Sequence, residues 1–469
     1  MNPFVVGPDQ ALTLFPDVGS PFGAMFFLFL HGGWIIVIIV SLWGGWEGWV
    51  LYIQNKYQSK IPFVLLAIDI PRGNEQSPKA VEHIFSHIFG FIRTYDLYER
   101  FVEGKTQLGV SLEIVSIEGY IQFLIRTPVK FRDLVEAAIY AQYPEAEITE
   151  VEDYIDMLPK PLELPHPEYD VWGTEFKLAH NYLYPIKTYP NFEHSLSQKF
   201  LDPMASLMEI LSRMGPGEHL WYQLVISPVT EDWKQKGISL INKLIGKKDG
   251  AKSVADWLYF PREIGKGLSE SFTASIIPPT EMEGPQRQRN IQDWPSQMQH
   301  LSPAERDIVE AIGMKISKIG YESKLRMIYG AKKKNAQLSK GLDGVIGTVH
   351  QFAAQNTNGF RPDMKTFSRA KFLFAKSRLL ARKRRLLWSY RYRSLWRGRK
   401  NYVLNIEELA TIWHFPIIDV KVPSVQKVDS KKAQAPIDLP LEQAPERLGR
   451  IAMPPAEQKG VPPPNLPTA

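Results

Sequence analysis

The chain has 469 residues, 44% of them hydrophobic and 23% charged, and it contains no cysteine. This length allows two or three domains, and the lack of cysteine excludes disulfides, thiolate metal sites and cysteine nucleophiles. The net charge is +6, but residues 361–400 hold 15 basic residues and one acid, a charge of +14, so the rest of the chain sums to −8.

The first element in chain order is an apolar segment. Residues 22–46 are 25 in number and carry no charge, whereas about 20 helical residues suffice to cross a hydrocarbon core. We expect a transmembrane helix over 22–53; the alternative is a buried helix of a soluble protein, which is seldom uncharged all round. Because Lys56 and Lys60 follow the segment and no basic residue precedes it, residues 1–21 are expected outside. The chain is thus predicted to be a single-pass protein of the inner (plasma) membrane, with its bulk in the cytoplasm.

The next region, 61–154, predicts a ferredoxin-like domain. Its apolar residues alternate where strands are expected and recur at three or four residue steps where helices are expected. The order of elements is strand, helix, strand, strand, helix, strand, which is that of a split βαβ sheet with both helices on one face. The predicted elements are a strand at 61–71, a helix from Ser77, a hairpin at 110–128, a helix at 131–143 and a strand at 146–154.

Prolines over 159–167 indicate a domain boundary, and 170–360 predicts a second, degenerate α+β domain. Ser302 and Glu305 form a capping box that marks a helix start within it. Residues 247–300, rich in Gly, Pro, Gln and Lys, are interpreted as an insertion or a mobile loop. The two domains share no clear sequence repeat, so a duplication stays open. Residues 417–469 are proline-rich and predict an extended tail.

The sequence contains no recognisable catalytic grouping. Its nearest approach to a phosphate-binding loop, LIGKKDGAKS at 244–253, has the wrong glycine spacing and no Ser or Thr after Gly246-Lys247. We therefore predict no catalytic, cofactor-binding or metal-binding residues, and a protein that is not an enzyme.

The basic region, within 361–416, combines cations with aromatic residues, and three interpretations stay open. It could contact DNA or RNA, lie on the anionic inner leaflet, or face an acidic partner as a solvated helix. The residues predicted to contact nucleic acid or lipid are Arg378, Arg382, Lys383, Arg384, Arg385, Trp388, Arg391, Arg393 and Arg397.

Two segments carry a resemblance to a known family. They are SLEIVSIEGYIQFLIRTPVKFRDLVEAAIYAQYPEAEITEVEDY (111–154) and VLNIEELATIWHFP (403–416), the second followed by VKVPSVQKV and APIDLP. They resemble the membrane-associated amino-terminal region of conjugation-type, HerA/FtsK-like DNA-pumping ATPases of type IV secretion, found in small-genome uncultured bacteria. In such relatives a RecA-like motor domain with a phosphate-binding loop follows, whereas this sequence stops before it.

The resemblance implies a secretion or conjugation component whose motor ATPase is a separate polypeptide. We expect a membrane-anchored scaffold that recruits this motor, with Trp413 and Phe415 as docking anchors. Membrane lipid, DNA and further copies of the chain are the other partners considered. The alternative is a membrane-tethered nucleic-acid-binding protein that acts without a motor.

Overall fold

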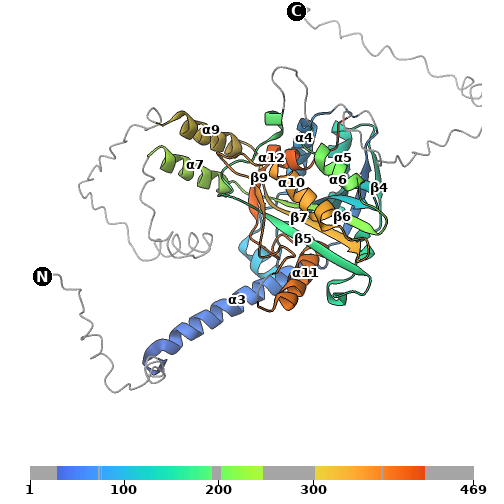
Figure 1. Ribbon diagram of the computed structural model, residues 1–469. Coiled ribbons are helices and arrows are strands. Elements are labelled where there is room, and N and C mark those ends of the chain that lie inside the picture. The colour runs from blue at the N-terminus through green and yellow to red at the C-terminus, as the bar shows by residue number, and fades with distance from the viewer. Residues whose placement is uncertain are drawn as a thin grey trace, which may run out of the picture. The chain divides into compact units, whose positions relative to one another are not determined.

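The computed structural model describes residues 29–71, 74, 76–192, 202–246, 301–370 and 373–417. These residues form an α+β fold around a large antiparallel sheet with strand order β4-β1-β3-β2-β6-β7-β5-β8; β9 pairs with β7 beside this path (Figure 1). The predicted α+β class is confirmed. The predicted insertion over 247–300 and the tail beyond 417 lie outside the described residues.

The first half of the sheet follows the predicted order of elements. Its strands lie in the order β4-β1-β3-β2, and every neighbouring pair is antiparallel. The β2-β3 turn falls at Glu118 and Gly119, both with positive φ, a conformation that glycine adopts freely. The elements of this half are β1 (Phe63–Asp69), α4 (Pro78–Ile88), β2 (Val110–Ile117), β3 (Tyr120–Pro128), α5 (Arg132–Gln142) and β4 (Glu147–Glu150).

The second half repeats this topology. Its strand order β6-β7-β5-β8 corresponds to β2-β3-β1-β4, so the repeat that the sequence left open is present in the arrangement of strands. Two further helices, α7 (Asp232–Leu244) and α9 (Pro303–Ser317), lie in the chain between β6 and β7, and the predicted Ser302 and Glu305 box caps α9. The elements that match the first half are β5 (Tyr169–Leu178), α6 (Ala205–Ser212), β6 (Glu218–Pro228), β7 (Gly320–Lys332), α10 (Gly344–His350) and β8 (Phe360–Pro362).

The two halves share one sheet because β2 pairs with β6 along its whole length, with Ile114 opposite Tyr222. The proline-rich stretch predicted as a boundary is no exposed linker, since Pro161 and Leu164 are buried. The regions predicted as separate domains are therefore joined through a continuous row of main-chain hydrogen bonds.

The sheet buries side chains on both of its faces. Along β2, Leu112 and Ile114 point into a large core shared with α4, α5, α6 and α12 (Ile406–Ile412), whereas Val115 lies in a second core on the opposite face. Alternation of this kind follows from the two-residue period of a strand. The second face is covered by α11 (Ala375–Arg391), the helix of the predicted basic region.

Helix α3 (Trp34–Gln58), preceded by the helical turn η1 (Phe29–Gly33), joins this fold through its carboxyl-terminal half. There Ile53 is buried and Gln58 Nε2 donates to Thr106 Oγ1 at 3.1 Å. Gly104 has φ +75°, and an added Cβ would lie 2.5 Å from the Ile53 carbonyl, so only glycine fits. No helix among the described residues is long and apolar enough to cross a membrane, so the predicted span over 22–53 has no support from them.

Candidate functional site

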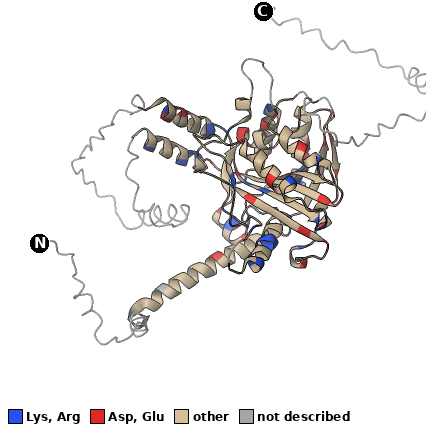
Figure 2. Cartoon of the chain, viewed as in Figure 1, with Lys and Arg blue, Asp and Glu red and all other residues tan. Residues whose placement is uncertain are grey.

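Helix α11 carries most of the residues predicted to contact nucleic acid or lipid. It holds seven basic residues and no acid, and Figure 2 shows blue segments, which mark Lys and Arg, along the ribbon of this helix. Leu386, Leu387 and Tyr390 fix one side of the helix to the second core, against Val115 and Trp221 of the sheet. The opposite side faces solvent.

Cations on the inward side and flanks of α11 are held by acids or backbone carbonyls of the fold. Lys383 Nζ lies 2.6 Å from Asp170 Oδ1, and Arg391 pairs with Asp156. Arg384 Nε donates to the carbonyl of Leu164, in the segment before β5, at 3.2 Å. These contacts hold the helix in place. They also engage cations that would otherwise be available to a ligand.

Arg393, just beyond α11, belongs to a buried network. Its Nε lies 2.9 Å from Glu113 Oε1, and its Nη2 lies 2.9 Å from Asp153 Oδ1. Tyr154 and Gln223 donate to the Glu113 carboxylate at 2.7 and 3.0 Å. Burial alone would raise the pKa of Glu113, but the charge of Arg393 and the hydrogen bonds from Arg393, Ser111 and Tyr154 outweigh it and lower that pKa. Glu113 is therefore a buried, ionised carboxylate balanced by Arg393.

A second buried ion pair lies beneath the loop after α11. Arg326 Nε of β7 donates to Glu175 Oε1 of β5 at 2.8 Å, and its Nη2 donates to the Arg397 carbonyl at 3.1 Å. Lys324 Nζ donates to the same carbonyl at 2.9 Å. Burial, followed by repulsion from Arg326, lowers the pKa of Lys324 to about 8. The loop is thus held on the sheet by two cations from one strand.

The residues that α11 turns toward solvent form a surface that we name the outward stripe. Arg378 and Arg385 are exposed, and neither side chain has an ion pair or hydrogen bond within the described part of the chain. Trp388 and Tyr392 stack with ring centroids 5.1 Å apart, and the Arg397 guanidinium lies 5.7 and 5.0 Å from the two centroids. Helical spacing places on this stripe Phe374, Arg378, Ala381, Arg385, Trp388 and Tyr392.

The nine predicted contact residues therefore divide into two groups. Those turned outward are Arg378, Arg385, Trp388 and Arg397. Those used by the fold are Arg382, Lys383, Arg384, Arg391 and Arg393, whose cations meet carboxylates or backbone carbonyls of the same chain. Within this second group the prediction of a ligand contact is corrected for the buried Lys383 and Arg393, and for the partly exposed Arg382, Arg384 and Arg391 it stays a prediction.

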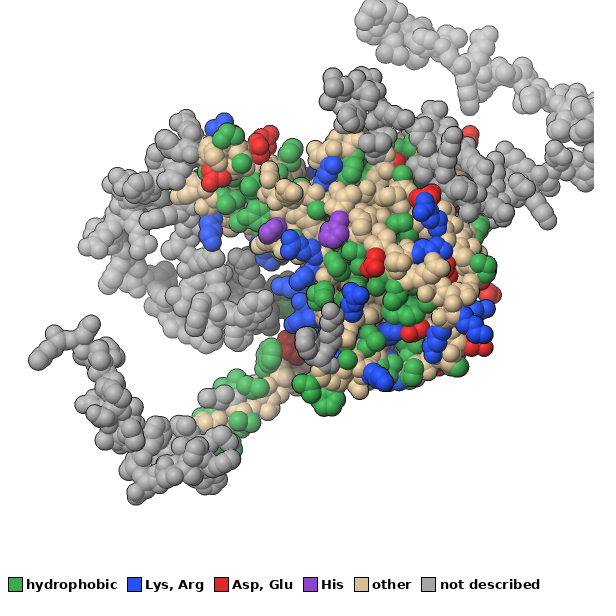
Figure 3. All heavy atoms as spheres, in the orientation of Figure 1, with side chains coloured by type: hydrophobic (Ala, Val, Ile, Leu, Met, Phe, Trp, Pro, Cys, Tyr) green, Lys and Arg blue, Asp and Glu red, His purple; other side chains and the backbone are tan. Residues whose placement is uncertain are grey.

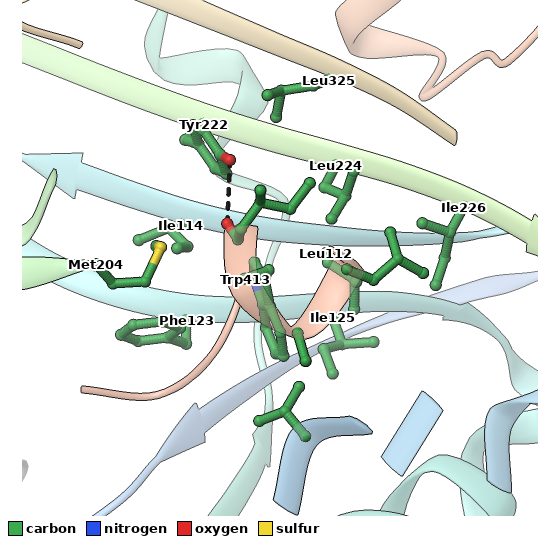
Figure 4. Close-up of a cluster of buried hydrophobic side chains, with 14 of the residues drawn as sticks. Leu112, Ile114, Phe123, Ile125, Met204, Tyr222, Leu224, Ile226, Leu325 and Trp413 are labelled. Atoms are coloured by element: carbon green, nitrogen blue, oxygen red, sulfur yellow. Dashed lines mark hydrogen bonds between the residues drawn. The ribbon is translucent and has the colours of Figure 1, made fainter. Parts of the chain in front are cut away.

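The prediction that Trp413 and Phe415 are docking anchors is wrong. Trp413 is 0% exposed and Phe415 is 1% exposed, and both belong to the large core. Figure 4 shows Trp413 among side chains of β2, β3 and β6, and Tyr222 donates to the Ile412 carbonyl at 3.1 Å. These rings hold α12 (Ile406–Ile412) on the sheet and are closed to a partner.

The buried ions on the strands were missed by the sequence reasoning. These ions are Glu113, Glu175 and Arg326, and each side chain points from its strand toward α11 or the loop after it. A charged residue within an otherwise apolar strand, as in SLEIVSI, is a usable signal, because such a charge is rarely buried without a partner. Among the described residues, no three His, Asp or Glu side chains are grouped to hold a metal ion.

The model of one protein family, Domain of unknown function (DUF8128), matches residues 71–428. The chain belongs to this family. The match begins after β1 and includes α11, the buried ion network and α12. No curated protein matches the chain.

Proposed function

We propose that this chain is a non-enzymatic, membrane-anchored scaffold of a type IV secretion or conjugation-like transfer machine, which recruits a separate cytoplasmic motor ATPase. The observation that carries the proposal is the exposed apolar surface of α3. Leu42 is 70% exposed and Trp43 65%, and exposed large apolar residues follow one another along this helix from Trp34 to Tyr52. An apolar surface of this extent that the described residues leave uncovered is typical of a site for a membrane or a partner.

The proposed anchor is the uncharged stretch 22–46. It ends at Trp46, the first residue of an aromatic group that also contains Trp49 and Tyr52. Amphipathic rings favour the headgroup level of a bilayer. Trp46 also contacts Phe101, at a centroid distance of 5.4 Å, within the turn η3 (Glu99–Glu103). In this arrangement the aromatic end of the anchor meets the folded part of the chain at the membrane surface.

The proposed orientation predicts the outcome of a reporter experiment. A reporter that is active only in the cytoplasm should work when fused after Lys60 and fail when fused before Pro21, because the basic residues follow the anchor. Reporter activity in intact cells is the measurement, with protein amounts compared by immunoblot. The opposite pattern would place the folded part outside and remove the proposed contact with a cytoplasmic motor.

Recruitment of the motor rests on the resemblance to conjugation-type ATPases, in which a motor domain follows the proline-rich segment. Since residues 402–417 are part of the fold, the connection to the motor is expected beyond them. β9 (Tyr402–Asn405) pairs with β7, Lys315 Nζ lies 2.9 Å from Glu408 Oε2, and His414 Nε2 lies 2.9 Å from Asp202 Oδ1.

A chain that ends at Ile417 should therefore fold and insert but lose its motor. Both this variant and the full chain would be purified in detergent from native membranes, and ATP hydrolysis in the two eluates compared. We expect hydrolysis with the full chain only, and none after the motor is stripped by salt. Equal hydrolysis in both eluates, or hydrolysis by the stripped full chain, would contradict the scaffold proposal.

A second candidate function is that of a membrane-tethered nucleic-acid-binding protein without a motor. It is favoured by the stacked Trp388 and Tyr392 pair beside Arg397, since bases stack on aromatic rings next to cations. Binding of single-stranded DNA by the purified chain, followed by fluorescence anisotropy at two salt concentrations, separates this function from the first.

A further inference from the structure

The loop that follows α11 packs close to the segment that the end of α3 contacts. Gln58, at the end of α3, is hydrogen-bonded to Thr106, and β2 begins four residues later at Val110. At Gly109 a Cβ would lie 3.6 Å from Leu395 Cδ1, so the loop after α11 packs on the segment that α3 joins. If α3 enters a membrane, α11 and this loop are near its surface.

The two ends of the stripe are large and apolar. Phe374 is 77% exposed and Leu373 beside it 78%, and at the other end Tyr392 and Trp396 are also exposed. Side chains of this kind gain free energy when they enter the boundary between headgroups and acyl chains. Bases of single-stranded DNA stack on aromatic rings but offer the aliphatic Leu373 no comparable gain. In Figure 3, hydrophobic and basic side chains lie side by side over the part of the surface that α11 occupies in Figure 1.

The centre of the stripe is positive and has no acid of its own. α11 contains no Asp or Glu, and the acids beneath it are already paired: Asp170 with Lys383, and Asp156 with Arg391. Arg378 and Arg385 therefore present uncompensated charge to solvent. Long arginine side chains can reach phosphate groups while apolar neighbours insert beside them.

We propose that the outward stripe, with the loop after α11, binds the anionic headgroups of the membrane in which the chain is anchored. This inference rests on the proposed function and adds a second membrane contact, which fixes the orientation of the folded part. Each basic residue near an anionic surface contributes a similar favourable amount to the free energy of binding. Replacing both Arg378 and Arg385 by Gln should thus lower the ratio of docked to undocked chains about 30-fold.

The lack of cysteine in the chain permits a direct test. Ala381, at the centre of the stripe, and Ala304, on α9, are both exposed and give a matched pair of labelling sites. The full chain with A381C or A304C would carry an environment-sensitive dye and be reconstituted in nanodiscs. The nanodiscs would contain phosphatidylcholine alone or an equimolar mixture with phosphatidylserine.

We expect a blue shift of the dye at A381C in the phosphatidylserine mixture, reversed by high salt and largely lost in R378Q/R385Q. No shift is expected at A304C or in phosphatidylcholine alone. If the emission of the dye at A381C does not change with phosphatidylserine, or shifts with added DNA instead, the inference is overturned. The proposed membrane anchor is not affected by that result. Failure of the chain to co-elute with lipid would overturn the proposed function and this inference together.

Discussion

Replacing Trp413 by alanine is expected to lower the free energy of unfolding by about 3–5 kcal/mol, the range for large buried aromatic residues. The ring is fully buried, with centroid distances of 6.2 Å to Phe85, 6.1 Å to Phe123 and 5.1 Å to Phe415. Its loss would leave a cavity between α12 and the sheet, at the centre of the region in Figure 4. The measurement is a urea titration of the detergent-purified chain, followed by circular dichroism.

The matched control for this variant is Trp396→Ala. Trp396 is largely exposed on the loop after α11, so its removal should change the free energy of unfolding by less than about 0.5 kcal/mol. Equal effects of the two substitutions would mean that Trp413 lies outside the core. In that case its role as a docking anchor would have to be reconsidered.

Replacing Arg393 by methionine is expected to cost about 3–5 kcal/mol, because it leaves Glu113 charged and buried without its partner. Arg385→Met, on the exposed side of the same region, is the matched control and should be nearly neutral. Adding Glu113→Gln to the Arg393 variant should recover part of the loss, which a double-mutant cycle measures. A loss that is the same with Glu113 and with Gln at this position would show that the pair is not coupled.

The same substitution predicts a change with pH. In the native chain the pKa of Glu113 lies below its ordinary value of 4.5, so its contribution to stability is present above that value and is lost as pH falls through the lower pKa. Without Arg393, burial dominates and raises the pKa of Glu113, so protonation relieves the buried charge. The difference in unfolding free energy between the native chain and the variant should therefore shrink on acidification.

The first half of the sheet could be predicted from the sequence because its elements are local. The hairpin β2-β3 and helices α4 and α5 each bury one face within a short stretch of sequence. The spacing of apolar residues within each element, among them Ile114, Phe123 and Ile139, indicates which face is buried. The second half could be predicted only in outline. β6 pairs with β7 across about ninety intervening residues, most of them outside the described part, and no local pattern sets that pairing.

The candidate site shows the same limit. Composition located the basic region correctly, but it could not separate Arg393, whose partner Glu113 lies 280 residues away in the chain, from the exposed Arg385. Trp413 was misplaced for a related reason, since aromatic residues beside a proline-rich tail resemble a docking motif until β3 and β6 are packed against them. Long-range packing determines whether Arg393 and Trp413 are buried. The periodic spacing of residues within one helix does not predict such packing.

The claim that α3 and the segment before it anchor the chain in a membrane is tested most directly by alkaline carbonate extraction. Ile39 and Leu42 are exposed on α3, and placing lysine at both should cost about 5–7 kcal/mol of insertion free energy. Leu162→Lys, at an exposed apolar residue elsewhere on the fold, is the control. We predict that the native chain and L162K stay in the membrane pellet and that I39K/L42K appears in the supernatant. Release of the native chain, or retention of I39K/L42K, would contradict the account.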